Sequence, residues 1–293
     1  MSATKTHPVT KSATPSATAM AVPPTVPPPA APSAAPSALL SEYLRQLHLS
    51  SFVRNWESFA QDAARSGCSY DGYLLALVEN EIAHRQRNCH ARRIQAARFP
   101  VLRELVDFDF SAVPSLSKPT ILELARGDYI ARSENLILVG EPGVGKTHLA
   151  TALAACACRQ GRRVRFYNVA TLVNDLLSAQ DQHQVERFIA HARKHQLIVL
   201  DELGFIPFSP SGAQLLFQFC SSLHTHLAFI ITTNLKFADW VQVFGNATLT
   251  AALLDRLTHH ATIIDFAGAE SYRFKQRLHR QTHGGASTNA LLP

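Results

Sequence analysis

The sequence predicts an α/β fold in which helices cover both faces of a five-stranded parallel sheet. Short, continuously apolar stretches such as LILVG, residues 136–140, alternate with segments of helical periodicity. Strands that are buried on both faces have this uninterrupted apolar character. The first stretch also runs directly into a glycine-rich turn and a further helical segment. We expect the five strands at residues 136–140, 164–169, 197–201, 227–233 and 262–266.

The glycine-rich turn reads GEPGVGKT, residues 140–147, and matches the pattern G-x-x-x-x-G-K-[ST] of phosphate-binding loops. A chance glycine-rich turn is the alternative, but the motif requires a strand before it and a helix after it, and both are predicted here. In such loops the lysine reaches the β and γ phosphates and the hydroxyl ligates Mg²⁺. We therefore predict ATP and Mg²⁺ as cofactors, with Lys146 catalytic and Thr147 a magnesium ligand. The nucleotide-binding residues expected in this segment are Gly140, Glu141, Pro142, Gly143, Val144, Gly145, Lys146, Thr147 and His148.

Polar side chains end the third and fourth strands. LIVLDE places Asp201 beside the loop, where it would bind the nucleotide's Mg²⁺ partly through water, and Glu202 directly after it. A carboxylate in that position can polarise an attacking water, so we predict that Glu202 is catalytic and that the reaction is ATP hydrolysis. Asn234 follows IITT and would be catalytic by orienting that water, if the fourth strand lies between the first and the third. A helix-capping asparagine is the alternative.

Composition divides the chain into four parts. Residues 1–38 are rich in Ala, Pro, Ser and Thr and bury too little to offset the entropy of ordering, so we predict disorder. Residues 39–103 show helical periodicity, and residues 39–110 are predicted to form a small helical domain that binds DNA or a partner. Residues 111–281 would form the ATPase domain. The tail 282–293 is again expected to be disordered.

Residues 84–103 carry six arginines and no acidic residue. A solvated helix face is the alternative, but such faces usually interleave acids with bases. A basic surface without a base-reading motif suits phosphates, so we predict salt-sensitive binding to the backbone of duplex DNA. Arg162, Arg163 and Arg165 add a second basic cluster. The predicted DNA-binding residues are Arg85, Arg87, Arg92, Arg93 and Arg98.

The bulk composition narrows the class of protein. A net charge of +6 permits a polyanionic partner without requiring one. The 5 cysteines are odd in number and include no Cys-x-x-Cys pair, which disfavours a zinc site or a disulfide framework. No apolar run approaches the ~18 residues of a membrane helix, and no signal sequence begins the chain. We predict a cytoplasmic protein without a membrane partner.

Taken together, the phosphate-binding loop, LIVLDE, the polar end of the fourth strand and an arginine before the fifth strand resemble the AAA+ ATPases. The resemblance implies that Arg256 is catalytic and projects to the γ-phosphate held by a neighbouring subunit. The planar guanidinium fork suits phosphate oxygens; an arginine that complements a helix C-terminus is the alternative. A finger supplied in trans implies an ATP-dependent homo-oligomer. Because only residues 267–293 follow the fifth strand, we do not expect a full C-terminal lid.

Within that family, the chain is most similar to the lidless IstB-type transposition helpers of insertion sequences, over roughly residues 39–280. The motifs that carry the resemblance are AARFPVLRELVDFDFS (96–111), LDELGFIP (200–207), LLDRLTHHA (253–261) and GAESYR (268–273). The resemblance offers Arg273 as a further nucleotide-binding arginine, and a surface arginine is the alternative.

The resemblance also implies a function. Proteins of this type are ATP-dependent, DNA-binding helpers that assemble on duplex target DNA and hydrolyse ATP to reset. Their partner is the transposase encoded by the same element, which they recruit and stimulate. A DnaC-type replicative helicase loader, which has a related core and would prefer single-stranded DNA, is the alternative.

Overall fold

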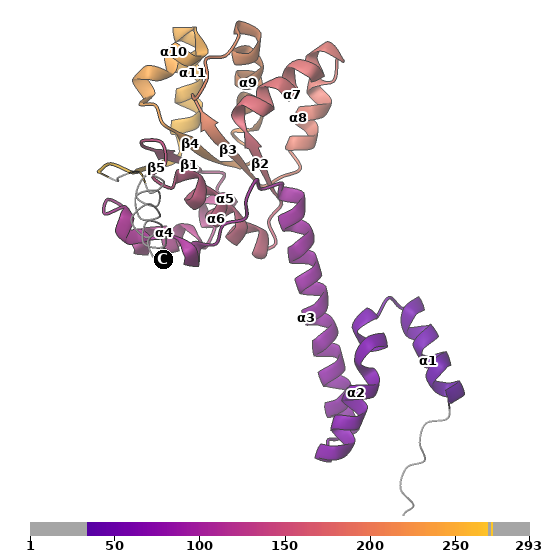
Figure 1. Cartoon of the computed structure of the whole chain (residues 1–293). Helices are drawn as coiled ribbons and strands as arrows, with labels where there is room; N and C mark the ends of the chain where they lie inside the picture. Colours follow the sequence, from indigo (N-terminus) through magenta and orange to yellow (C-terminus); the bar gives the residue numbers. More distant parts are fainter. Residues whose placement is uncertain (1–33, 269–270, 272–293) are drawn as a thin grey trace, which may run out of the picture. The chain divides into compact units, whose positions relative to one another are not determined.

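The computed structural model describes residues 34–268 and Ser271 (Figure 1). These residues form two compact units, and the boundary falls after Glu81, inside helix α3 (Tyr70–Ala97). The boundary predicted from the sequence lies later, at residue 110. It differs because the segment after α3 buries Phe108 and Val113 in an apolar cluster of the second unit. The functions assigned to the domains stay predictions, and the tail 282–293 lies outside the described residues.

The first unit contains α1 (Ala34–Gln46), α2 (Ser50–Ser66) and the beginning of α3. Because α1 begins at Ala34, residues 34–38 are helical where the sequence predicted disorder. Pro36 lies in the first turn, where the missing N–H needs no partner within the helix. A helix can therefore start within this proline-containing stretch. Residues 1–33 lie outside the described part of the chain.

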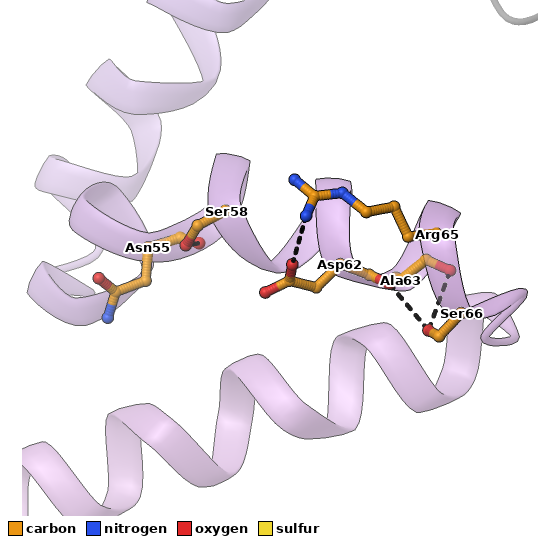
Figure 2. A network of polar contacts seen from close by, with 6 residues as sticks. All are labelled: Asn55, Ser58, Asp62, Ala63, Arg65 and Ser66. Carbon is orange, nitrogen blue, oxygen red and sulfur yellow. Dashed lines mark hydrogen bonds and ion pairs between the residues drawn. The ribbon is translucent and has the colours of Figure 1, made fainter.

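A buried carboxylate joins α2 to α3. The backbone N–H and the hydroxyl of Ser51 donate to Oε2 of Glu81 at 2.9 and 2.6 Å, and both residues are buried. Near the end of α2, Asp62 and Arg65 form an ion pair of 3.9 Å, and the Ser66 hydroxyl donates to the Asp62 carbonyl at 2.8 Å (Figure 2). The exposed ion pair contributes little to stability, whereas the buried contact fixes how α2 packs on α3.

The second unit is built on a five-stranded parallel sheet with the order β2-β3-β4-β1-β5. The strands are β1 (Asn135–Val139), β2 (Val164–Asn168), β3 (Leu197–Leu203), β4 (Ala228–Thr233) and β5 (Ala261–Asp265). All five predicted strands are confirmed, with ends that differ by one or two residues. The fourth strand lies between the first and the third, as the prediction for Asn234 required.

Helices cover both faces of this sheet (Figure 1). Alternate strand residues point to opposite faces, so Ile137 packs in one apolar cluster whereas Leu136 and Leu138 pack in the other. The first cluster includes residues of α7 (Val169–Asp181), α8 (Val185–Ala192), α9 (Pro210–Leu223), α10 (Trp240–Phe244) and α11 (Ala247–Thr258). The second includes α4 (Lys118–Leu124), α5 (Asp128–Ala131) and α6 (Lys146–Arg159). Within residues 34–268, no helix is both long and apolar enough to cross a membrane.

One buried asparagine connects three elements of the second unit. Asn135, at the start of β1, is only 3% exposed. Its Nδ2 donates to the Leu257 carbonyl near the end of α11 at 2.9 Å, and its Oδ1 accepts from the Phe229 N–H of β4 at 2.9 Å. Both partners are backbone groups that would otherwise stay unpaired in the interior, so the side chain holds α11 against the sheet.

We predict that Asn135→Leu lowers the free energy of unfolding by about 2–4 kcal/mol, because it leaves two buried backbone groups without a partner. Urea unfolding followed by tryptophan fluorescence measures the change. The control is Asn174→Leu on the exposed surface of α7, which should stay within about 0.5 kcal/mol of the unchanged protein. Equal stabilities of the two variants would contradict the role of Asn135.

Candidate nucleotide-binding site

The phosphate-binding loop connects β1 to α6 at the carboxyl end of the sheet, and its glycines are required by geometry. Gly145 caps α6 with a φ of 103°, which L side chains rarely adopt, and a Cβ there would lie 3.3 Å from the Phe108 ring. A Cβ on Gly140 would lie 2.7 Å from Cβ of Phe266. The backbone can therefore follow this path only with glycine at both positions.

Lys146 is the first residue of α6 and is almost fully buried, at 8% exposure. Its Nζ donates to the carbonyls of Gly140 at 2.7 Å and Glu141 at 2.9 Å. The ammonium is thereby held over the loop itself. A charge in this place, next to the amino end of α6, attracts the phosphates of a nucleotide.

Asp201 and Thr147 meet beside the loop. Oδ1 of Asp201 accepts from the Thr147 hydroxyl at 2.8 Å and from the Thr232 hydroxyl at 2.7 Å. Burial raises the pKa of Asp201, the two hydroxyl donors oppose that rise, and the charge of Glu202 adds to it. A hard cation prefers such a set of hydroxyl and carboxylate oxygens, so Thr147 and Asp201 could hold Mg²⁺.

Glu202 occupies a bulge in β3. The register between β3 and β4 shifts between Leu200 and Leu203, and Glu202 has a φ of 62°, which is strained for a residue other than glycine. Its N–H donates to Oγ1 of Thr232 at 2.9 Å, and its carboxylate accepts from Nδ2 of Asn168 at 2.9 Å. The bulge changes the alternation of side chains, so that the carboxylate lies on the cleft beside the loop.

These residues border a cleft of about 810 Å³. The residues lining it include 142–148 of the loop and α6, Thr151, Glu202, Phe205, Thr232, Thr233 and Asn234. The volume is in the range of small-molecule and cofactor sites. Asn234 thus reaches the same cleft as Glu202, although its catalytic role stays a prediction.

A further wall of the cleft, which was not predicted from the sequence, comes from the segment after α3. This segment includes the short helices η1 (Leu105–Asp107) and η2 (Phe110–Ala112). Its lining residues are Pro100, Val101, Arg103, Asp107, Phe108, Asp109, Ala112 and Val113. The motif AARFPVLRELVDFDFS suggested a family resemblance but no position in space, because it has no secondary-structure period.

Contacts with α6 fix this segment. The Phe108 ring lies edge-on against His148 at 5.3 Å between centroids, and Nε2 of His148 lies 3.2 Å from the Glu104 carbonyl oxygen. The Glu104 carboxylate forms an ion pair with Arg159 at the other end of α6. His148, predicted to bind nucleotide, therefore also connects the cleft wall to the loop helix.

Arg256 lies on α11 and is half-buried. Its guanidinium stacks over the Phe217 ring at 5.0 Å and donates to the Ala252 carbonyl at 2.8 Å. In the described part of this chain, Arg256 is not among the residues that line the cleft. Arg273, the second predicted arginine, lies outside the described residues.

The predicted DNA-binding arginines lie on and just after the carboxyl half of α3. Arg85, Arg87 and Arg92 are exposed, and Arg93 is half-buried. Arg98 follows the helix, is exposed and has a φ of 58°. None of these five arginines lines the nucleotide cleft.

We predict that Asp201→Asn raises the melting temperature of the nucleotide-free protein at neutral pH. Because the folded-state pKa of Asp201 is raised, its ionised form is disfavoured; the cost is present above that pKa and disappears as the pH falls below it. The amide oxygen can still accept from both threonines. Differential scanning calorimetry measures the shift, about 2–4 °C for each kcal/mol recovered. The matched variant Asp175→Asn, on the exposed side of α7, should show no such rise; a lower melting temperature for Asp201→Asn would contradict the burial cost.

Solved structures with related chains include the crystal structure of the DnaC helicase loader, which is 24% identical, covers 50% of this chain and 86% of its own, and has a TM-score of 0.44. AMPPCP-bound DnaA from Aquifex aeolicus is 16% identical, with a TM-score of 0.48, and the match covers 61% of this chain and 54% of DnaA.

Sequence relatives are closer. The chain is 36% identical over 239 residues to the "Insertion sequence IS21 putative ATP-binding protein" of Pseudomonas aeruginosa, covering 82% of this chain and 89% of the relative. It is 33% identical over 238 residues to the "Insertion sequence IS5376 putative ATP-binding protein" of Geobacillus stearothermophilus, covering 81% and 94%. Residues 42–280 match the family model described as IstB-like ATP binding protein. The chain therefore belongs to the IstB-like family of ATP-binding proteins.

Proposed function

We propose that this protein is an ATP-hydrolysing, DNA-binding helper of transposition. In this proposal it assembles on duplex target DNA, recruits and stimulates the transposase of the same element, and hydrolyses ATP to reset. The observation that carries the ATPase assignment is that Lys146, Thr147 and Glu202 line one cleft, with Asp201 hydrogen-bonded to the Thr147 hydroxyl. The role in transposition is supported by relatives that are named ATP-binding proteins of insertion sequences.

The chemistry assigned to the cleft needs few groups. Lys146 and the N–H groups of the loop would hold the phosphates, and Thr147 and Asp201 would hold Mg²⁺, which supplies charge neutralisation when bound. Glu202 would accept a hydrogen bond from a water and polarise that water for attack, and Asn234 would orient the same water. The hydrogen bond from Asn168 fixes the carboxylate of Glu202, so the general base has a defined position before attack.

Arg256 is assigned to the site of a neighbouring subunit. Two observations support this assignment: the side chain does not line its own cleft, and Phe217 and the Ala252 carbonyl hold its guanidinium in place on α11. A preorganised guanidinium loses little entropy when it meets phosphate oxygens. The ATPase would then be complete only in an oligomer.

We expect Arg256→Ala to retain ATP binding and to lose roughly 10³–10⁵ in turnover, the usual value of an arginine finger. Mixing it with Lys146→Ala should restore part of the turnover, because the second variant still supplies Arg256 to the intact cleft of the first. Steady-state phosphate release from the single variants and from their mixtures measures this. Normal turnover by Arg256→Ala alone would sink the finger assignment.

The transposition role predicts large complexes on duplex DNA that require ATP. Sedimentation of the full chain with ATP and with equal lengths of duplex or single-stranded DNA tests this, and Lys146→Ala is the control that should not assemble. We expect large complexes on the duplex only, and they should weaken steeply with salt, because the predicted contacts are to phosphates. A clear preference for single-stranded DNA would contradict the transposition role and favour helicase loading.

A further inference from the structure

Two basic segments that are far apart in the sequence lie together at one edge of the sheet. β2 is an edge strand, and Arg162, Arg163 and Arg165 lie just before it and on it. Arg93 and Arg98 lie at the end of α3 and directly after it. We call these five arginines the β2-edge surface.

Direct contacts place the two segments side by side. A guanidinium nitrogen of Arg165 donates to the Ala96 carbonyl at 3.3 Å. The Cys158 thiol lies 3.9 Å from the Arg93 carbonyl oxygen, and the Arg93 guanidinium carbon lies 3.7 Å from where a Cβ on Gly161 would be. The rings of Phe99 and Phe166, with centroids 6.2 Å apart, pack beneath the same junction.

The charges of the β2-edge surface are not neutralised within the described part of the chain. There, none of its five arginines forms an ion pair with a carboxylate, whereas Arg159 pairs with Glu104 and Arg132 pairs with Glu134. The surface lies within residues 84–103 and 154–168, and neither stretch contains an acidic residue. Glu104 directly follows the first stretch and pairs with Arg159. The surface therefore presents several guanidinium groups to an outside anion.

The charges of the β2-edge surface change the pKa values of two neighbouring side chains, His195 and Tyr167. Burial lowers the pKa of His195, and the charges of His191, Arg165 and Arg163 lower it further, against a hydrogen bond to the Ala192 carbonyl. Burial raises the pKa of Tyr167 and the charge of Asp175 adds to the rise, whereas Arg165 and Arg98 oppose it. Arginines from both segments thus act on residues of the same region.

We propose that the β2-edge surface is one composite site for the phosphate backbone of nucleic acid, in which Arg162, Arg163 and Arg165 act together with Arg93 and Arg98. It rests on the proposed function, and it extends the DNA contact from the end of α3 to the ATPase sheet. Guanidinium forks on a rigid sheet edge and on a helix end can bind phosphates several ångströms apart on one strand. With no base-reading motif beside them, they would bind any sequence alike.

The test uses the double variant Arg162→Gln/Arg163→Gln in the full chain. Fluorescence anisotropy with a labelled duplex, in the presence of a slowly hydrolysed ATP analogue, gives the affinity over a series of salt concentrations. Each lost phosphate contact should reduce the slope of log affinity against log salt by about 1, so we expect a reduction of about 2 and a loss of affinity of roughly tenfold or more near 0.1 M salt. Circular dichroism and the melting temperature show that the variant is folded.

Matched variants separate charge from structure. Arg162→Lys/Arg163→Lys keeps both charges and should keep most of the slope. Arg187→Gln removes one charge from the exposed surface of α8 and should leave the slope unchanged. If the double glutamine variant does not fold, Arg163→Gln alone, at an exposed position, should still reduce the slope by about 1.

Three results would overturn the proposal, and they differ in meaning. If the unchanged chain binds duplex and the glutamine variants bind with the same affinity and slope, the β2-edge surface is not the site but the proposed function stands. If the unchanged chain itself does not bind duplex, the DNA-binding part of the proposed function fails together with this inference. If the glutamine variants lose binding to anionic phospholipid vesicles but keep their binding to duplex, the proposal is also overturned, and the surface would serve a lipid partner instead.

Discussion

The candidate site depends on the shared hydrogen bonding of one carboxylate oxygen. Oδ1 of Asp201 accepts from Thr147 on α6 and from Thr232 on β4, so that a single atom connects the loop helix with two adjacent strands. Thr232 in turn accepts the N–H of Glu202 and supports the bulge. Burial makes this arrangement costly for an ionised carboxylate. The folded protein is therefore less stable with Asp201 ionised, as is usual where a buried carboxylate is positioned to bind a cation.

Much of this architecture is readable from the sequence because it follows from local rules. Five continuous apolar stretches predicted the strands, and GEPGVGKT predicted the loop with Lys146 and Thr147, since only glycines permit that backbone path. Asp201 and Glu202 followed because the carboxyl ends of parallel strands meet at one edge of a sheet.

What was missed depends on tertiary packing. Nothing local marks Asn135 as the link between α11 and β4, or Asn168 as the partner of Glu202, because each contact joins residues far apart in the chain. The cleft wall formed by Phe108 and its neighbours has no secondary-structure period in the sequence, so its position could not be predicted. Helix α1 begins earlier than composition suggested, because proline is tolerated in a first helical turn.

The segment that follows α3, residues 98–113, takes part in both proposed binding sites. It leaves α3 at Arg98, within the β2-edge surface, and continues through Pro100 and Phe108, which line the nucleotide cleft. Energetic coupling between two ligands is reciprocal, whatever its mechanism. A segment shared by both sites would therefore couple them in both directions. If bound nucleotide raises the affinity for DNA by some factor, bound DNA raises the affinity for nucleotide by the same factor. Under that linkage, bound DNA would be reported at the cleft as a tighter equilibrium hold on nucleotide.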